Sequence, residues 1–591
     1  MPCVEQAQSS AKYIIKMTHG PTSKTVLVLD ADMVSALATA RALHRYGLTV
    51  DVASAVDQPL CAYSNSIHKA FRYPDPLTDD QGFVAWVVQR ASETRYALVI
   101  PMTERTLVPI AQHRARFEGI KLAIASDTAL EAVLDKARTL EIAHALEIPA
   151  PRSTLVDAID ALERHTAEFA YPIVVKPARS FGTHNQQRTQ LSVDYAFNAN
   201  ELRAKTTHAL RFGAVLLQEY VGGQGVGIEL IADNGKIIYA FQHRRLHEVP
   251  LTGGGSSLRI SEAVNPTLLE ASSQLMRALA WHGVAMVEFK RDPVSGRFSL
   301  MEINGRFWGS LPLAIAAGAD FPAMLYELMV DGVVQSRPPA RNAVYGRSLS
   351  RDLYWTELVL RREGPASLVD FPSRKQILKD ALLFFSPRHH LDVQAWRDPR
   401  PGIMDIGEIV STQMKRVSRL IADRRLARRL QKSWGNGEVS NRLRESRQIL
   451  FLCYGNINRS ALAERCFKVR HPGITIACIS AGFHETTGRA ADPAMVEVAG
   501  KLGLDLRDWH SQSLNEDMMQ HSDIIFVMEQ QHYRRIANSY PAALQRTFLL
   551  DPSGDIDDPY GKSPETYADC AEKVSICIER IAAILNPQGH T

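Results

Sequence analysis

The segment RQILFLCYGNINRSALAERCF (447–467) runs from a β-rich apolar stretch into a helical pattern. A tight loop between a strand and a helix brings several backbone N–H groups to one point, beside the positive end of the helix dipole. Gly455 permits the tight turn, and Arg459 supplies an always-charged fork for two phosphate oxygens. The same field favours the thiolate of Cys453, which Ser460 can hydrogen-bond. The segment therefore predicts a phosphate-binding loop with a cysteine nucleophile.

A C-x5-R pattern alone is not decisive, because in many proteins it marks only a buried strand cysteine. A phosphatase also needs a general acid opposite the nucleophile, since an aryl or alkyl oxyanion leaves poorly unless it is protonated. Asp558 lies downstream in the turn-rich stretch DIDDPYG (555–561). Taken by itself, its Asp-Pro dipeptide indicates only a turn.

The order of several stretches strengthens this interpretation. Residues 446–588 resemble the low-molecular-weight protein tyrosine phosphatase family, which implies a small, doubly wound, four-stranded parallel sheet with helices on both faces. The matching stretches are LFLCYGNINRSALAE (450–464), ISAG (479–482), LGLDLRDWHSQSL (502–514), SDIIFVME (522–529) and DPYG (558–561).

The resemblance also implies roles for single residues. Cys453 is the expected nucleophile, Arg459 the phosphate-binding group and Asp558 the general acid. Asn456, Ser460, Ser480 and His510 are expected to hold the loop, and Tyr560 to line its entrance. The other positions of the phosphate loop are Tyr454, Gly455, Ile457 and Asn458.

Two positions depart from the family pattern. Asn458 stands where many members carry a second cysteine, which traps the oxidised nucleophile as a disulfide. Ile457 stands where phosphoarginine phosphatases carry threonine, which favours phosphotyrosine. Fold relatives that reduce arsenate use extra cysteines, but Cys570 and Cys577 are two helical turns apart, ~10 Å, too far for a disulfide. We expect both to be core residues.

The N-terminal third alternates strands and helices. TVLVLDAD (25–32), a helical stretch, LTVDVAS (48–54), ALVIPMTE (97–104) and LAIAS (122–126) predict a small doubly wound domain that ends near residue 125. The following segment reads as longer strands with hairpins, whose turns are DNG (233–235) and DPVSGR (292–297).

Three acidic or amide side chains on two of these strands suggest a metal site. Glu288 and Glu302 are flanked by apolar residues, where carboxylates are costly unless they bind a cation, and hard oxygen ligands suit Mg²⁺. Asn304 points to the same face as Glu302. Lys176 ends another strand, YPIVVKP (171–177), where it could hold a nucleotide phosphate. Each residue alone could also be an ordinary surface side chain.

In sequence, these pieces resemble the ATP-grasp superfamily over residues 25–340. The resemblance implies ATP and Mg²⁺ (or Mn²⁺) as cofactors. Lys136 and Lys176 are expected to bind ATP phosphates under a loop with Ser180 and Gly182, and the hinge Gln218, Glu219, Tyr220 and Val221 to hold adenine. Glu288, Glu302 and Asn304 are expected to ligate the metal, and Arg306 to stabilise the transferred phosphoryl group. Gly225 replaces the usual ribose-binding acid, which leaves Glu229 for that role.

The glycine-rich stretch HRRLHEVPLTGGGSSLRISE (243–262) is expected to form a mobile loop over the acceptor site, with Arg245 and Arg259 for an anionic substrate. Family chemistry phosphorylates a carboxylate with ATP, and an amine or similar nucleophile then captures the acyl phosphate. The motifs do not identify the acid or the amine. An alternative is an ATP-binding sensor domain that regulates the phosphatase; another is a phosphatase acting on a small phosphorylated metabolite of the same pathway.

These interpretations predict an α/β and α+β multidomain protein. The expected segments are a flexible N-terminus (1–24), a doubly wound pre-ATP-grasp domain (25–125), an ATP-grasp domain (126–340), a helical extension with a basic linker (341–445) and the phosphatase (446–588). WGNGEVSN (434–441) is the clearest linker. The basic stretch 415–432 reads as a solvated amphipathic helix, with contact to anionic lipid or nucleic acid as the alternative.

Composition adds little about partners. The net charge is +4 for 591 residues, which favours no nucleic-acid partner, and the hydrophobic fraction of 45% is ordinary. Seven cysteines, an odd number, do not form a secreted disulfide framework. With no transmembrane segment or signal peptide apparent, we expect a cytoplasmic enzyme whose partners are small carboxylates and amines and a phosphorylated protein or metabolite. The oligomeric state is left open.

Overall fold

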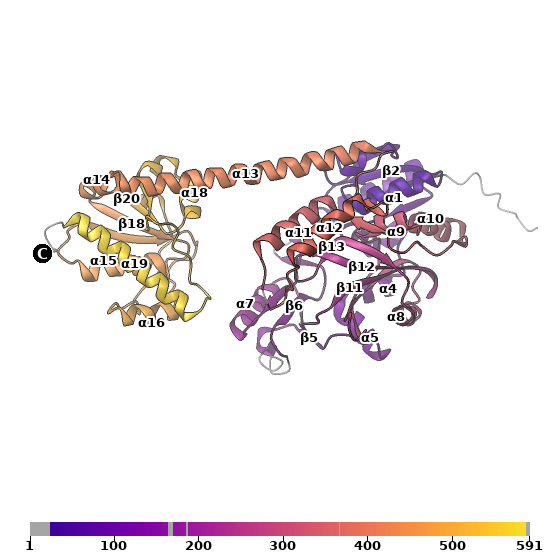
Figure 1. Ribbon diagram of the computed structural model, residues 1–591, viewed down its shortest axis with the longest axis horizontal. Coiled ribbons are helices and arrows are strands. Elements are labelled where there is room, and N and C mark those ends of the chain that lie inside the picture. Colours follow the sequence, from indigo (N-terminus) through magenta and orange to yellow (C-terminus); the bar gives the residue numbers. More distant parts are fainter. Residues whose placement is uncertain (1–23, 163–168, 185–186, 366, 587–591) are drawn as a thin grey trace, which may run out of the picture. The chain divides into compact units, whose positions relative to one another are not determined.

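The computed structural model describes residues 24–162, 169–184, 187–365 and 367–586, so the expected flexible N-terminus lies almost wholly outside the described residues. The chain divides into two compact units, Met1–Val410 and Ser411–Thr591. The boundary falls within α13 (Pro399–Gly435), the long helix drawn in orange in Figure 1. Each unit is described by itself.

The first sheet of unit 1 is parallel, in the order β3-β2-β1-β4. The central strand β1 and its neighbour β4 are nearly continuous apolar runs, as expected of strands that are covered on both faces, whereas the edge strand β3 is mostly exposed. Leu27 of β1, Val52 of β2 and Val99 of β4 are fully buried. The elements of this doubly wound part are β1 (Thr25–Val28), α1 (Val34–Arg45), β2 (Thr49–Ser54), β3 (Lys69–Arg72), α2 (Asp80–Thr94), β4 (Leu98–Ile100) and α3 (Glu104–Gln112).

Two further sheets follow in unit 1. A four-stranded sheet has the order β5-β10-β6-β9, and a seven-stranded sheet the order β15-β14-β11-β12-β13-β16-β17. The strands of the first are β5 (Ser153–Val156), β6 (Ile173–Pro177), β9 (Asp194–Ala196) and β10 (Val215–Glu219); β7 (Phe181–His184) and β8 (Gln187–Gln190) form a small hairpin. Those of the second are β11 (Gln224–Asp233), β12 (Lys236–Val249), β13 (Gly255–Glu262), β14 (Gly283–Arg291), β15 (Phe298–Asn304), β16 (Tyr345–Arg347) and β17 (His389–Leu391).

Both predicted hairpin turns are present in the large sheet. Asn234 and Gly235 join β11 to β12 with positive φ angles of 46° and 87°, which Asn and Gly tolerate best. The turn 292–297 joins β14 to β15. Helices cover this unit on several sides (Figure 1). They are α4 (Asp127–Leu134), α5 (Lys136–Ala145), α7 (Ala199–Ala209), α8 (Pro266–Ala278), α9 (Leu311–Ala317), α10 (Phe321–Tyr326), α11 (Leu349–Arg361) and α12 (Arg374–Leu382).

Two sequence predictions about this fold were wrong, and a third is incomplete. The stretch 243–262 is not a mobile loop but an antiparallel hairpin of β12 and β13, with only residues 250–254 as its turn. The extension 341–445 is mostly helical, but it also contains β16 and β17, which complete the large sheet. Residues 434–441 are mostly helical rather than a linker, and the Trp434 indole donates to the Leu549 carbonyl at 3.0 Å.

Unit 2 contains the predicted four-stranded parallel sheet, in the order β19-β18-β20-β21. Phe451 and Phe526 stack in its core with ring centroids 5.9 Å apart. Its strands are β18 (Gln448–Cys453), β19 (Ala477–Gly482), β20 (Ile524–Val527) and β21 (Thr547–Leu549). Its helices are α14 (Glu438–Glu445), α15 (Arg459–Arg470), α16 (Pro493–Lys501), α17 (Glu516–His521), α18 (Gln530–Ser539) and α19 (Pro564–Leu585).

The amphipathic helix predicted at 415–432 lies within α13. Leu426 and Leu430 pack on the core of unit 2, whereas Val417, Leu420 and Ile421 are exposed. Within the described residues, no single helix is both long and apolar enough to cross a membrane; a bent pair, Leu311–Ala317 with Phe321–Asp331, meets the criterion by length and composition only.

Candidate active sites

Cys453 ends the buried strand β18, and α15 begins six residues later at Arg459. The backbone N–H of Asn456 donates to the Cys453 Sγ at 3.1 Å, and the Ser460 Oγ lies 3.0 Å from that sulfur. Gly482 on β19 makes room for the loop, because a Cβ there would come within 2.9 Å of Tyr454 and Asn456 backbone atoms. The Cys453 sulfur therefore lies at a helix N-terminus, within hydrogen-bond distance of a backbone N–H and a hydroxyl.

Asn456 is the centre of the loop's support. It is fully buried, with a positive φ of 52°, a conformation that non-glycine residues adopt at some cost. Its amide nitrogen donates to Ser460 Oγ at 2.9 Å and Ser480 Oγ at 2.8 Å. Its side-chain oxygen accepts from the Gln512 N–H at 2.8 Å. These bonds hold the loop in a shape that its backbone would not otherwise prefer.

The structure does not bring His510 to the loop. Its side chain is exposed, and its Nδ1 lies 3.0 Å from the Asp508 carbonyl. The neighbouring Trp509 donates to the Asn456 carbonyl at 2.8 Å instead. Trp509 and Gln512 both belong to the segment 502–514 singled out from the sequence. The sequence signal for the Trp509 contact was the alternation of inward and outward side chains along the segment, because the neighbours of an exposed residue point inward.

Arg459 is 1% exposed and lies among carboxylates. Its Nη2 forms an ion pair with Asp558 at 2.6 Å, and its Nη1 donates to the Ile556 carbonyl at 2.7 Å and to Glu529. Burial works against the charge, but Cys453 and Asp558 outweigh it and raise the pKa of Arg459. Arg459, the predicted phosphate-binding residue, therefore lies close to the predicted nucleophile Cys453 and is paired with the predicted acid Asp558. Tyr454 and Tyr560 are exposed at 47% and 67%.

Sequence reasoning missed Glu529. It follows β20 at the same carboxyl edge of the sheet as Cys453, and it is the last residue of the segment 522–529. A carboxylate directly after a buried parallel strand was the signal that could have found it. We regard Glu529 as a positioning residue, because it holds the Arg459 guanidinium.

The second site lies in unit 1, on two adjacent strands. Glu288 of β14 and Glu302 of β15 are direct cross-strand partners. The Asn304 side-chain nitrogen donates to both carboxylates, at 3.1 and 3.2 Å. Burial raises the pKa of Glu288, whereas Lys176 and Lys136 overcome the effect of burial and lower the pKa of Glu302. Two carboxylates and an amide, which presents its oxygen after a flip, are a suitable donor set for Mg²⁺.

The predicted nucleotide-binding residues surround a cavity of about 550 Å³. Lys176, at the end of β6, is buried, which lowers its pKa. The cavity is also lined by Gln218, Glu219, Tyr220, Val221, Arg245, Arg259, Glu288, Glu302, Asn304 and Arg306. Lys136 and Ser180 line a smaller neighbouring cavity of about 100 Å³, which Glu302, Asn304 and Arg306 share, and the two side chains are 3.3 Å apart. Gly182 lies against Phe212, where a Cβ would come within 2.6 Å of its carbonyl.

The structure does not place Glu229 in the cavity lining. Its carboxylate is fully buried, 2.9 Å from the His243 Nδ1, and accepts from the Ser310 hydroxyl at 2.7 Å. Arg245 and Arg259 do line the cavity, but as parts of strands. Arg245 forms an ion pair with Glu288 at 2.5 Å. These strand arginines have fixed positions rather than the mobile ones expected from the glycine-rich sequence.

Comparison with known proteins decides what the C-terminal site is. The model of the low molecular weight phosphotyrosine protein phosphatase family matches residues 448–590. The probable phosphatase EpsP of Ralstonia solanacearum is 36% identical over 116 residues, which make up 19% of this chain and 79% of that protein. The C-terminal part of the chain belongs to this family. The crystal structure of the Erwinia amylovora tyrosine phosphatase AmsI is 31% identical and covers 23% of this chain and 91% of its own, with a TM-score of 0.22.

The N-terminal part matches a second family model. Residues 211–350 match the family described as ATP-grasp in the biosynthetic pathway with Ter operon. The N-terminal part therefore carries an ATP-grasp domain, and the chain is an enzyme in both parts. The biotin carboxylase domain of Hydrogenobacter thermophilus 2-oxoglutarate carboxylase, solved with MgADP, ADP and bicarbonate, is 16% identical. It covers 55% of this chain and 74% of its own, with a TM-score of 0.44.

The remaining cysteines of the phosphatase domain lie in its core. Cys570 and Cys577 are buried on α19, as predicted, and burial raises the pKa of each to about 12. Neither forms a disulfide.

Asn458, which stands in the loop itself, is 3% exposed, and its side-chain oxygen has no hydrogen-bond partner among the described residues.

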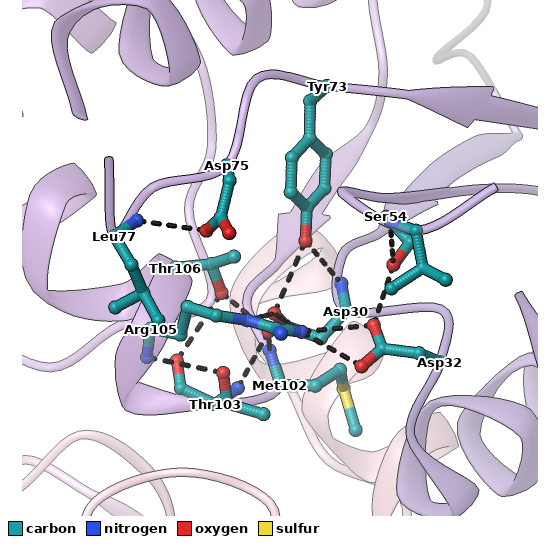
Figure 2. Close-up of polar contacts among 11 residues, drawn as sticks. Asp30, Asp32, Ser54, Tyr73, Asp75, Leu77, Met102, Thr103, Arg105 and Thr106 are labelled. Atoms are coloured by element: carbon teal, nitrogen blue, oxygen red, sulfur yellow. Dashed lines mark hydrogen bonds and ion pairs between the residues drawn. The ribbon is translucent and has the colours of Figure 1, made fainter. Parts of the chain in front are cut away.

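Figure 2 shows a polar network at the carboxyl end of the first sheet of unit 1. Asp30 follows β1 with a positive φ of 54° and accepts from the Thr103 N–H at 2.9 Å and the Thr106 hydroxyl at 2.6 Å. The Arg105 guanidinium lies between Asp30, at 3.1 Å, and Asp32, at 3.0 Å. The edge between β1 and β4 is where a doubly wound sheet usually binds its ligand. Here protein side chains occupy that position.

A buried histidine predicts how the stability of the phosphatase domain depends on pH. His532 is 1% exposed and stacks on Phe483 at 5.5 Å; burial, followed by Arg459, lowers its pKa to about 3. Because the unfolded chain binds this proton near pH 6.5, the stability from neutral His532 is complete above that pH and is lost as the pH falls towards 3. We expect the urea midpoint of phosphatase activity to fall less between pH 7 and pH 5 in His532→Phe than in the wild type.

The exposed His521, which lies on α17, provides the control for that prediction. His521→Asn should follow the wild-type pH dependence. Activity is normalised at each pH to the value without urea, so that catalytic effects cancel. Equal pH dependence of the wild type and His532→Phe would contradict the burial argument.

Proposed function

We propose that the chain joins an ATP- and Mg²⁺-dependent carboxylate ligase to a cysteine-dependent phosphatase. The cross-strand pair Glu288 and Glu302, with Lys176 buried beside it, is the observation that supports the ligase. We also propose the domain bounds 25–125, 126–340, 341–445 and 446–588, and a reducing compartment such as the cytoplasm, which suits a thiolate nucleophile.

In the proposed ligase reaction, a carboxylate oxygen attacks the γ-phosphorus of ATP and the bond to the β-phosphate oxygen breaks. ADP leaves, and an acyl phosphate remains. An amine nitrogen then attacks the acyl carbon, loses a proton, and expels inorganic phosphate as the amide forms. Mg²⁺, or Mn²⁺, when held by Glu288, Glu302 and Asn304, supplies charge neutralisation. Lys176 and Arg306 orient and neutralise the phosphoryl oxygens.

ADP release tests this half of the proposal. The chain is supplied with ATP, Mg²⁺ and a panel of carboxylates with and without amines. Turnover that needs both an acid and an amine supports a ligase. ATP binding without turnover for any pair would favour the alternative, an ATP-binding sensor domain.

In the proposed phosphatase reaction, the Cys453 sulfur attacks phosphorus while Asp558 protonates the leaving oxygen. Water then attacks the phosphocysteine, Asp558 accepts its proton, and the thiolate leaves. Arg459 binds two phosphate oxygens throughout. The ion pair of Arg459 with Asp558 at 2.6 Å supports this assignment, because a phosphate held by Arg459 would lie beside the Asp558 carboxyl. Hydrolysis rates of p-nitrophenyl phosphate, a phosphotyrosine peptide and phosphoarginine will indicate whether Ile457 favours the aryl monoester.

The general-acid role predicts a leaving-group effect. Asp558→Asn removes the proton donor but keeps the shape of the side chain, so we expect kcat/KM for phenyl phosphate, which reports the step that expels the leaving group, to fall by about 10²–10⁴-fold. The loss should be much smaller for p-nitrophenyl phosphate, whose leaving group needs little protonation. Equal losses for the two substrates would show that Asp558 acts in some other way. Asp557→Asn, next in sequence, is the matched control.

A further inference from the structure

Most cations that line the large cavity of unit 1 already have an acidic group beside them; Lys176, which forms no ion pair among the described residues, faces Glu302 and Glu288. Arg245 pairs with Glu288 and Glu248, and Lys290 with Glu248 at 3.3 Å. Two further arginines of the cavity lining are also paired. Arg259 pairs with Asp392 at 2.6 Å, and Arg306 pairs with Glu104 at 3.5 Å.

Arg351 is different. Its side chain lines the same cavity, and among the described residues its guanidinium has neither a hydrogen bond nor an ion pair, although the residue as a whole is exposed. The nearest charged groups are Arg259, which opposes the Arg351 charge, and Asp392, which Arg259 already engages. Desolvation and Arg259 lower the pKa of Arg351. Two arginines, Arg351 and Arg259, therefore face one carboxylate, Asp392, in this part of the cavity, which leaves an excess of one positive charge.

The surroundings of Arg351 suit a carboxylate. Arg351 lies in the first turn of α11, whose N-cap Ser348 makes no capping hydrogen bond and lines the cavity. The free N–H groups and the dipole of a helix N-terminus favour an anion. The Arg351 guanidinium lies against Gly255, where a Cβ would come within 2.1 Å of its Nη1. Glycine at 255 is thus what permits this position of the guanidinium.

This position is separate from the metal-side carboxylates. Arg259 belongs to β13 and Glu288 to β14, and β12 and β11 lie between those strands. Three interstrand spacings amount to roughly 14 Å. Along β12, moreover, the residue in register with Glu288 is His243, whereas Gly255, beside the Arg351 guanidinium, is opposite Val249, six residues further along the strand. A carboxylate that is phosphorylated beside Glu288 and Glu302 is therefore not the group that neutralises Arg351.

We infer that the ligase substrate carries a second carboxylate, which Arg351 binds beside Arg259 and the N-terminus of α11. The inference rests on the proposed ligase function and names its substrate class, an acid with two anionic groups. The guanidinium fork accepts one carboxylate through two parallel hydrogen bonds. Arg351 comes from the extension 341–445, so this segment determines substrate specificity.

Arginine modification by phenylglyoxal tests the subsite residue by residue. The full chain is held with ADP and Mg²⁺, and peptide mass spectrometry follows the modification rate of Arg351 with glutarate or with chloride at equal ionic strength. We expect saturating glutarate to slow the modification of Arg351 at least about tenfold, because an ion pair with its carboxylate shields the guanidinium. Arg361, on the same helix and 58% exposed, should react equally in both buffers. Protection no greater than that by chloride would overturn the inference.

Two variants sharpen the test. Gly255→Val places a side chain where the Nη1 lies, so it should displace the guanidinium and abolish protection without removing a charge. Arg351→Ala should raise the KM of an accepted acid at least tenfold and leave kcat nearly unchanged. Protection without ADP release by any acid would count against the ligase but not the subsite. ADP release without protection would count against the subsite alone.

Discussion

Cys453→Ser is expected to lose p-nitrophenyl phosphate hydrolysis by about 10⁴-fold or more, as removal of a catalytic nucleophile does elsewhere. The hydroxyl keeps the size of the thiol, so the contacts of Asn456 and Ser460 at this position remain. It does not ionise near neutral pH, however, and so cannot attack phosphorus as the thiolate does. The measurement is kcat for p-nitrophenyl phosphate, with phosphotyrosine peptide as a second substrate.

Two controls accompany this variant. Cys577→Ser changes a thiol in the core, away from the loop, and should retain activity when the protein is folded. ATP-dependent ADP release should be the same in Cys453→Ser as in the wild type, since the ligase residues lie in the other unit. Substantial hydrolysis by Cys453→Ser would remove the basis for the nucleophile assignment.

Glu302→Gln is expected to lower acid-dependent ADP release by at least about a hundredfold. Loss of a residue that only supports a metal ligand costs up to about a hundredfold in metal affinity or activity, and loss of a ligand itself should cost at least as much. The amide has nearly the shape of the carboxylate but removes the charge that faces Lys176 and Lys136. Without it, the buried Lys176 and the partly exposed Lys136 lose a counter-charge, and Mg²⁺ loses a ligand. The measurement is the dependence of ADP release on Mg²⁺ concentration.

Glu262→Gln is the matched control for Glu302→Gln. Glu262 lies on β13 of the same sheet, pairs with Arg244 at 2.6 Å and is absent from the lining of both cavities. It should turn over ATP at the wild-type rate and with the wild-type Mg²⁺ dependence. If Glu302→Gln behaves in the same way, the metal assignment is wrong.

The parts of both sites that were predictable share one property: each is contiguous in sequence or set by strand alternation. The phosphate loop is a strand, a turn and a helix in one run of residues. Glu288 and Glu302 became cross-strand partners because the turn 292–297 fixes their register. Local rules of turns and alternation are sufficient for such features.

The parts that were not predictable depend on tertiary contacts. The glycines at 253–255 favour a mobile loop. In the structure only residues 250–254 form a turn, and the pairing of β12 with β13 orders the rest of the stretch. Arg351 lies in a segment without a legible motif, and it reaches the cavity because β16 pairs with β13 in the large sheet and α11 follows β16 directly in the chain. His510 illustrates the limit of motif matching, because the neighbouring Trp509 makes the contact to the loop.

The network of Asp30, Asp32 and Arg105 has a practical meaning for protein engineering. Arg105 joins two carboxylates at the carboxyl end of the first sheet, so we expect variation there to disturb the fold rather than substrate binding. A library built to widen the range of acids should leave these three positions alone and randomise Ser348, Arg351 and Gly255. In a selection for heat tolerance, the choice of positions should be the opposite. Substitutions near Asp30 should then be the ones whose frequencies change, because they alter the stability of the fold.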